Sequence, residues 1–420
     1  MNPETALTNS TASGREPLKE ALGGAAVLLF MLVLLFFRNW RMFVCPEPWA
    51  EDMAVFLRAE YVTGFPDTAF ALYAGYIHLL PRIIAWLSLK AGFENAMLVM
   101  NWSVLLIKAV TCFLILRTSL ICSRLMRAAI TAYLILMPFA DEIYNNVTNL
   151  QWWLIPLMAL IILRRGQSVP LLILEALILL LAGLTGVNSV IFAVPCAYLM
   201  IKDRTPESII KCSAVILCAL VQFYFLYTSG RSGTGRIIYE GGIADLISLI
   251  STRIILHTLF KVSAGTVPAI LLLVSFTALL AFMLQRFRTV REVRFIALFA
   301  GVYTAVIMYN ILKTEKDMDI LLTGFAGERY FVFLRICVFA LLVSALDLLF
   351  KSPHLRGNYK RLLTVTCLIL AVVFVRRYPV KFPFGFEYYA DLDRLEAAKP
   401  GENITIRFPP PDWNCVLRKK

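Results

Sequence analysis

Two adjacent carboxylates, Glu51 and Asp52, follow closely on the first long apolar segment of the chain, residues 21–37. The aromatic residues Trp49 and Phe56 flank the pair and are of the type that anchors a segment at a membrane surface. An ionised carboxylate held there can take a proton from a hydroxyl group. This stretch is therefore the first candidate for a catalytic site, with a pair of solvated loop carboxylates as the alternative.

Nearby positive and aromatic residues fit the same chemistry. A base that activates an acceptor hydroxyl needs cations to stabilise the departing group, and guanidinium groups suit a departing phosphate. Arg329 follows an expected loop, where a charged side chain reaching back to the membrane surface is the alternative. The candidate phosphate-binding residues are Tyr76, His78, Arg82, Arg329, Tyr330 and Arg335, with Arg231, Arg236 and Lys261 as further candidates.

A second acidic pair, Asp141 and Glu142, is expected to form another arm of the site or simply a polar helix end. Asn149 and Gln151 add hydrogen-bonding groups for an acceptor, beside tryptophans that an interfacial aromatic belt also explains. No metal ion is required by these residues, but Asp52, Asp141 and Glu142 are the carboxylates that could hold a divalent cation. The three histidines are scattered, so a histidine-based zinc site is not expected.

The composition requires lipid as a solvent. Of 420 residues, 59% are hydrophobic and 16% are charged, and the mean hydropathy is +0.73. The apolar runs are continuous, which favours spanning helices over the alternating strands of a barrel. The net charge of +13 is explained by basic loops on one membrane face, without a nucleic-acid partner.

The sequence predicts an all-α polytopic membrane protein with about eleven transmembrane helices. The first segment is expected to be retained as a span and not cleaved as a signal peptide. The predicted spans are residues 21–37, 94–116, 128–140, 151–163, 169–183, 187–201, 209–228, 265–284, 295–312, 331–349 and 362–375.

Charge predicts the orientation. With the N-terminus in the cytoplasm, the short basic loops between the spans all fall on the inner side, including Arg164 and Arg165. This requires that residues 67–90 do not cross the membrane, and we expect them to form broken interfacial helices in a large outer loop, 38–93.

The expected organisation is one membrane domain, 1–375, that contains the outer loop, and a short C-terminal extension, 376–420. The extension is too small for an independent domain and is expected on the outer face, packed on the outer loops. Cys45 and Cys415 are the cysteines expected on the outer side of the membrane, so a disulfide between them is one hypothesis and two unrelated thiols the other. Lys108 and Glu175 fall within predicted spans and are a candidate buried ion pair.

The order of these features resembles the GT-C superfamily of polytopic glycosyltransferases. In that superfamily, a first span leads into a large outer loop that opens with an acidic pair. Further similar segments are YAGYIHLLPR (73–82), VTNLQWW (147–153), GLTGVNSVIFAVP (183–195), GERYF (327–331) and RFPPPDWNCVL (407–417).

The resemblance implies transfer of a sugar from a polyprenyl-phosphate carrier to a cell-envelope glycan or lipid acceptor on the outer face of a bacterial inner membrane. Asp52 is then the expected base and Glu51 its helper or an acceptor-binding group, with the reverse assignment open. Some members of the superfamily use a divalent metal ion and others do not. The expected partners are the bilayer, the donor and acceptor lipids, and membrane proteins that make and flip the donor. A flippase of lipid-linked saccharides and a non-catalytic membrane scaffold are the alternatives.

Overall fold

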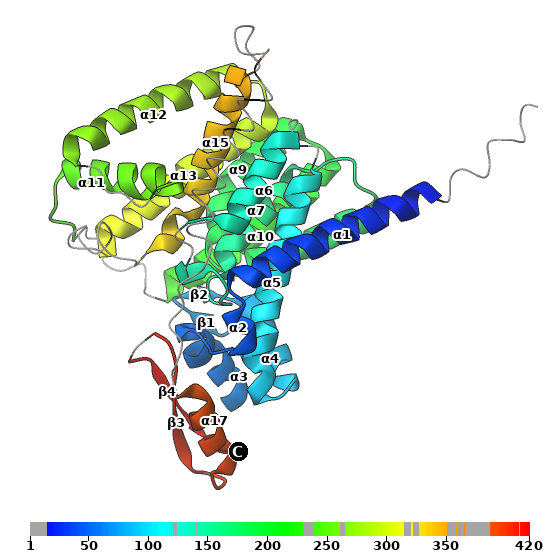
Figure 1. The fold of residues 1–420 in the computed structure, drawn as a ribbon, viewed down its shortest axis with the longest axis vertical. Helices are drawn as coiled ribbons and strands as arrows, with labels where there is room; N and C mark the ends of the chain where they lie inside the picture. Colours follow the sequence, from blue (N-terminus) through cyan, green and yellow to red (C-terminus); the bar gives the residue numbers. More distant parts are fainter. Residues whose placement is uncertain are drawn as a thin grey trace, which may run out of the picture.

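The computed structural model of the chain describes residues 15–118, 120, 124–138, 141–229, 238–260, 265–314, 321, 327–350, 358, 361, 365, 387–410 and 412–420. Most of these residues are helical, and the few strands form two short hairpins. The long helices form a bundle, one end of which carries the hairpin β1–β2 and the C-terminal residues (Figure 1).

The described residues of the N-terminal half form ten α-helices. They are α1 (Arg15–Arg38), α2 (Arg41–Val44), α3 (Arg58–Val62), α4 (Leu79–Lys90), α5 (Phe93–Arg117), α6 (Arg124–Leu136), α7 (Leu150–Leu163), α8 (Val169–Gly183), α9 (Asn188–Asp203) and α10 (Pro206–Thr228). Two short helical turns, η2 (Asp52–Leu57) and η3 (Asp141–Ile143), precede α3 and α7.

The C-terminal half adds helices around this bundle. They are α11 (Ile243–Leu249), α12 (Thr266–Arg286), α13 (Arg291–Thr314), α15 (Val332–Phe350) and α17 (Tyr388–Ala397), with the turns η4 (Ile250–Ile255), η5 (Leu256–Thr258) and η6 (Glu328–Phe331). The strands are β1 (Leu72–Tyr73), β2 (Tyr76–Ile77), β3 (Asn403–Arg407) and β4 (Asn414–Arg418).

The chain is a multi-pass membrane protein. Among the described residues, five helical segments are long and apolar enough to cross a bilayer: α5, α10, α12, α13 and the segment Glu328–Phe350 that contains α15. Helices also cover the other predicted spans up to residue 349, except that α6 ends at Leu136 and not at 140. Residues 362–375, the last predicted span, lie almost entirely outside the described residues.

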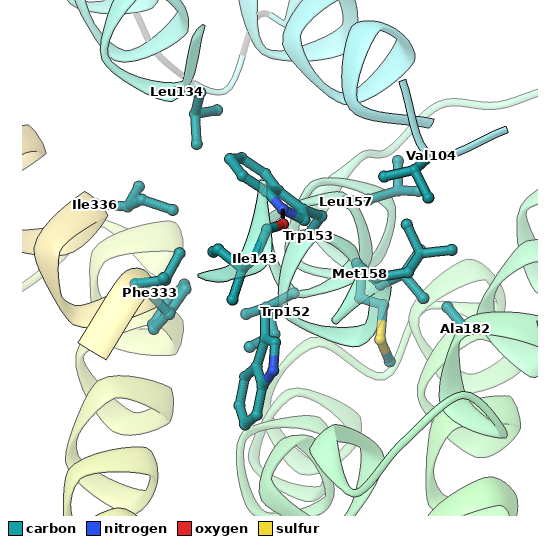
Figure 2. Packing of buried hydrophobic residues seen from close by; sticks show 14 of the residues in the cluster. Val104, Leu134, Ile143, Trp152, Trp153, Leu157, Met158, Ala182, Phe333 and Ile336 are labelled. Carbon is teal, nitrogen blue, oxygen red and sulfur yellow. Dashed lines mark hydrogen bonds between the residues drawn. The ribbon is translucent and has the colours of Figure 1, made fainter. Parts of the chain in front are cut away.

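Helix α7 is the centre of the bundle. All 14 of its residues are buried, and the helix is about 21 Å long. Figure 2 shows Trp152 and Trp153 within a cluster that includes Ile143 and Phe333. The Trp153 indole Nε1 donates a hydrogen bond to the Ile143 carbonyl at 2.9 Å, which ties η3 to the first turns of α7.

The prediction of broken helices at 67–90 is wrong for its first half. Residues 72–77 form a β-hairpin in which Tyr73 pairs with Tyr76, and the single helix α4 follows. Ala74 and Gly75 have φ values of +58° and +84°. Two consecutive positive φ angles produce the tight turn whose twist matches a hairpin, and this turn breaks the apolar run.

Three basic loops meet at the opposite end of the bundle. Asp203, at the end of α9, forms ion pairs with Arg165, which lies between α7 and α8, and with Arg291 at the start of α13. The Arg291 guanidinium also donates to the Leu163 carbonyl at 3.0 Å. The loops that carry these residues therefore lie together, as a common membrane face for them requires.

The expected pair between Lys108 and Glu175 does not form. Glu175 pairs with Arg164 at 3.0 Å and with Lys211 at 2.5 Å. Lys108 instead donates to the Tyr144 carbonyl, and its ammonium group lies 3.4 Å from the centre of the Tyr144 ring. Each buried cation thus has a partner, as the cost of burying charge requires.

The described C-terminal residues, 387–410 and 412–420, pack on the segment that follows α1. The Ala50 amide donates to the Pro409 carbonyl at 2.7 Å, and the Tyr389 hydroxyl donates to the Pro46 carbonyl at 3.1 Å. The hypothesis of a disulfide is not supported: both thiols are free, Cys45 exposed and Cys415 buried. Backbone and hydroxyl hydrogen bonds make this attachment.

The turn after α8 closes against the hairpin. The amide of Gly186 donates to the Ile77 carbonyl at 3.1 Å, and His78 forms a β-bridge with Thr185. Gly186 has a φ of +108°, and a Cβ atom there would collide with the Gln151 side chain. This glycine therefore allows the hairpin, the α8–α9 turn and α7 to approach one another.

We expect Gly186→Ala to destabilise the protein by roughly 1–3 kcal/mol, because overpacking adds to the backbone strain. The matched control is Gly166→Ala. Gly166 also has a positive φ, +72°, but an added Cβ there would meet no atom within 4 Å. Thermal unfolding in detergent should show a larger loss for Gly186→Ala. Equal losses of stability in the two variants would show that backbone strain alone accounts for the cost, without a clash at Gln151.

Candidate functional site

Asp52 is a buried anchor. Its side chain is only 1% exposed, and it accepts three hydrogen bonds from the loop that precedes α7. The donors are the Val147 amide at 2.9 Å, the Thr148 amide at 2.9 Å and the Thr148 hydroxyl at 2.6 Å. Asp52 therefore joins the segment between α1 and α4 to the 141–149 loop, across about 95 residues of sequence.

Burial changes the protonation of this carboxyl group. Desolvation raises the pKa of Asp52 to about 7, although the hydrogen bonds from Thr148 and Val147 oppose the rise. The negative charge of Glu51 adds a smaller upward shift. Proton binding at Asp52 is thus linked to the junction of the two loops.

Glu51 is the accessible member of the acidic pair. It is partly exposed and accepts a hydrogen bond from the Tyr73 hydroxyl at 3.1 Å. Burial and the Glu51 carboxylate raise the pKa of Tyr73, whereas the positive charge of Arg329 lowers it. Tyr73 therefore stays protonated and donates to Glu51. The charges of Glu51 and Arg329 thus act in opposite directions on the same hydroxyl group.

Arg329 forms the cationic side of the site. Its guanidinium pairs with Glu142 at 2.9 Å, and one third of its side chain is exposed. Burial raises the pKa of Glu142, Arg329 lowers it, and Glu51 adds an upward shift. The two carboxylates thus share one electrostatic environment with one accessible guanidinium group. A guanidinium group so placed can bind a phosphate.

The neighbour of Arg329 is an anchor like Asp52. Glu328 is 4% exposed and pairs with Arg253 at 3.0 Å and with Arg335 at 2.5 Å. The Arg335 Nε also donates to the Arg253 carbonyl at 2.7 Å. These buried contacts hold the turn η6 against η4 and α15. They thereby fix the position of the Arg329 backbone.

Aromatic side chains border the charged groups. Tyr76 lies across the hairpin from Tyr73, and its hydroxyl is 3.5 Å from the Gln151 amide nitrogen. The Tyr330 ring meets the Trp152 ring edge to face, with centroids 5.8 Å apart. We call Glu51, Tyr73, Tyr76, Glu142, Gln151, Arg329 and Tyr330 the candidate site.

Two predicted phosphate ligands are structural instead. The Arg82 guanidinium is buried, donates to the carbonyls of Val55 and Ala71 at 3.2 and 3.5 Å, and lies 4.9 Å from the Phe56 ring centre. His78 is fully buried against the rings of Tyr76 and Phe56, and burial lowers its pKa to about 3. A neutral, buried imidazole is a poor phosphate ligand.

Arg335 is also displaced from the predicted role. It is 0% exposed and its guanidinium contacts Glu328, so it positions η6 rather than facing the accessible groups. Three further candidates, Arg231, Arg236 and Lys261, lie outside the described residues.

The second predicted arm is present in part. Asn149 is buried: its amide donates to the Glu142 carbonyl at 3.1 Å, and its carbonyl oxygen accepts from the Trp152 indole at 3.2 Å. It therefore shapes the loop and offers no free group to an acceptor. Asp141 begins η3, but its side chain lies outside the described residues.

The described residues contain no group of three or more His, Cys, Asp or Glu side chains that could hold a metal ion. Asp52 and Glu142, two of the three carboxylates considered for a cation, are each bound to other partners: Asp52 to Val147 and Thr148, Glu142 to Arg329.

Sequence reasoning missed the residues that hold the site in place. Thr148 and Glu328 lie within the segments 147–153 and 327–331 singled out from the sequence, but only their long-range contacts show what they do. Arg253 stands alone in an apolar stretch, and a charge in such a stretch was the available signal.

No model of a protein family matches this sequence, and no curated protein matches it. A functional assignment therefore depends on the geometry of the candidate site.

The pH dependence of stability tests the contact between Asp52 and the 147–148 backbone. The pKa of Asp52 in the folded protein, about 7, lies above the value of roughly 4 for an unfolded carboxyl group. The folded state therefore binds more protons between these values, and this group's contribution to stability falls as pH rises through that window. Asp52→Asn lacks this titration but loses an acceptor, at a cost of roughly 1–3 kcal/mol.

We expect the stability difference between wild type and Asp52→Asn to narrow between pH 5 and pH 8. Thermal unfolding in detergent at pH 5 and at pH 8 measures this stability difference. Asp67→Asn, at an exposed carboxyl group, is the control and should show no such change. A gap that widens with pH would contradict the raised pKa.

Proposed function

We propose that this protein is a glycosyltransferase that moves a sugar from a polyprenyl-phosphate carrier to a cell-envelope glycan or lipid acceptor. The observation that carries the proposal is the grouping of an accessible carboxylate, Glu51, with an accessible guanidinium group, Arg329, at one end of a membrane bundle. A hydroxyl acceptor needs the first group and a phosphate leaving group needs the second.

The predicted roles of the acidic pair are reversed in this proposal. Glu51 is the catalytic base because it is partly exposed and has one hydrogen-bond donor, Tyr73. Asp52 is a positioning residue because its oxygens are occupied by Val147 and Thr148. Releasing Asp52 for catalysis would leave those buried donors unsatisfied, at roughly 1–3 kcal/mol each.

The reaction is a direct displacement at the sugar's anomeric carbon. Glu51 takes the proton of the acceptor hydroxyl, whose oxygen forms the new bond to that carbon. The bond from the carbon to the phosphate oxygen breaks, and polyprenyl phosphate leaves with the electron pair. Arg329 stabilises the negative charge on the phosphate. The Arg329 guanidinium group must therefore bind the substrate phosphate and Glu142 at the same time. The sugar is already activated by its phosphate, so no nucleotide takes part.

The proposal includes the arrangement expected of the GT-C superfamily: about eleven spans, a cytoplasmic N-terminus and a site on the outer face of a bacterial inner membrane. The contacts among the basic loops that carry Arg165, Asp203 and Arg291 support it, because these loops lie at the end of the bundle away from the β1–β2 hairpin (Figure 1). Tyr73 of that hairpin donates to Glu51. Lysine and arginine in short loops favour the cytoplasmic side.

Glu51→Gln should lower sugar transfer by about 10²- to 10⁴-fold, the usual contribution of a general base. Glu94→Gln, at an exposed carboxylate in the first turn of α5, is the matched control and should transfer normally. Mass spectrometry of the surface glycan and of the lipid-linked sugars in a complemented deletion strain gives the readout.

Loss of one sugar from the glycan, with its lipid-linked form retained, identifies the product of the transferase. Full activity in Glu51→Gln would reject Glu51 as the base. Accumulation of complete lipid-linked saccharides on the inner face in the deletion strain would reject transfer and support a flippase.

A further inference from the structure

An apolar cavity lies behind the β1–β2 hairpin. It has a volume of about 280 Å³ and lies between α8, α10, β2 and the segment that leads into β1. Its lining is wholly apolar apart from one thiol and includes Phe70, Ile77, Leu184, Leu217, Cys218 and Phe225. We call this cavity the α8–α10 groove. Such a lining has no groups to bind a sugar or a phosphate, and suits hydrocarbon.

The groove lies at the same end of the bundle as the candidate site. Leu184 immediately follows α8, and Phe225 lies in the last turn of α10. Gln222 of α10 accepts from the Ile77 amide at 2.9 Å and donates to the Ile77 carbonyl at 3.0 Å, which fixes β2 beside the groove. Side chains alternate along a strand, so Ile77 faces the groove and Tyr76 the opposite side.

The groove opens toward the lipid-facing surface. Phe70 and Leu217 line it, yet they are 60% and 58% exposed. Leu220, one turn from Leu217, is 63% exposed. Because α10 is apolar and long enough to span a bilayer, hydrocarbon chains can enter the groove from the side.

We infer that the α8–α10 groove binds the hydrocarbon chain of the lipid-linked sugar donor, at the isoprene units nearest its phosphate. This inference rests on the proposed function. A chain in the groove contacts one side of β2 while its polar end lies at the membrane surface, where the other side of the hairpin carries Tyr73 and Tyr76. The cavity's small volume suits a short stretch of a single chain.

The test uses the full-length protein in nanodiscs and two photoreactive probes. One is a polyprenyl phosphate with a diazirine in its first isoprene units, and the other is a phosphatidylglycerol with a diazirine in an acyl chain. Mass spectrometry then maps the crosslinks. We expect the prenyl probe to label the peptides that contain Leu184 and Leu217, and the phospholipid probe to be displaced from them by unlabelled polyprenyl phosphate.

Leu217→Trp should fill the groove and abolish prenyl labelling there. Leu220→Trp, at an equally exposed leucine that does not line the groove, is the matched control and should keep it. The wild-type crosslink map does not depend on how either variant folds. Prenyl labelling elsewhere, or phospholipid labelling of the groove that polyprenyl phosphate does not displace, would overturn the inference.

The same preparations separate this inference from the proposed function. If Glu51→Gln abolishes transfer while prenyl crosslinks map to another face, the groove assignment is wrong and the transferase stands. If the prenyl probe labels the groove although Glu51→Gln transfers sugar normally, the groove assignment stands and the catalytic assignment is wrong.

Discussion

The hydrogen bonds between Asp52 and the 147–148 backbone are the contact on which the site depends. They join two loops that are far apart in sequence, and each loop supplies a charged group, Glu51 from one and Glu142 from the other. A buried carboxylate is costly, and the three donors offset that cost only while the loops stay together. The spacing of Glu51 and Glu142 is thus set by Asp52, the residue next to Glu51.

The same device appears on the cationic side. Glu328 is buried between Arg253 and Arg335, while the next residue, Arg329, reaches the accessible groups. In both pairs, one charged residue is buried and fixes the backbone, and the adjacent charged residue is accessible. Asp52 and Glu328 are the buried members. The buried residue of each pair thus positions its accessible neighbour, Glu51 in one case and Arg329 in the other.

Much of this organisation can be predicted from the sequence, because long apolar runs and basic loops follow from the properties of the bilayer. The pattern also places Glu51, Asp52, Glu142 and Arg329 in one site. It cannot assign roles within the acidic pair, since the direction of each side chain depends on the positive φ of Ala50, +30°, and on the π-helical turn that follows. Partners such as Thr148 for Asp52 are set by tertiary contacts that no local pattern encodes.

The failures at Arg82 and His78 have one physical origin. Both residues lie in a segment with enough charge and aromatic character to suggest a surface, yet the turn at Ala74 and Gly75 folds the chain back and buries them. Once buried, the Arg82 guanidinium must find carbonyl acceptors, and the imidazole of His78 loses its proton. Their chemistry then supports the hairpin, whereas the hydroxyl groups of Tyr73 and Tyr76 lie beside Glu51 and Gln151. Residue type thus indicates where a site lies, and burial decides which of its residues can act.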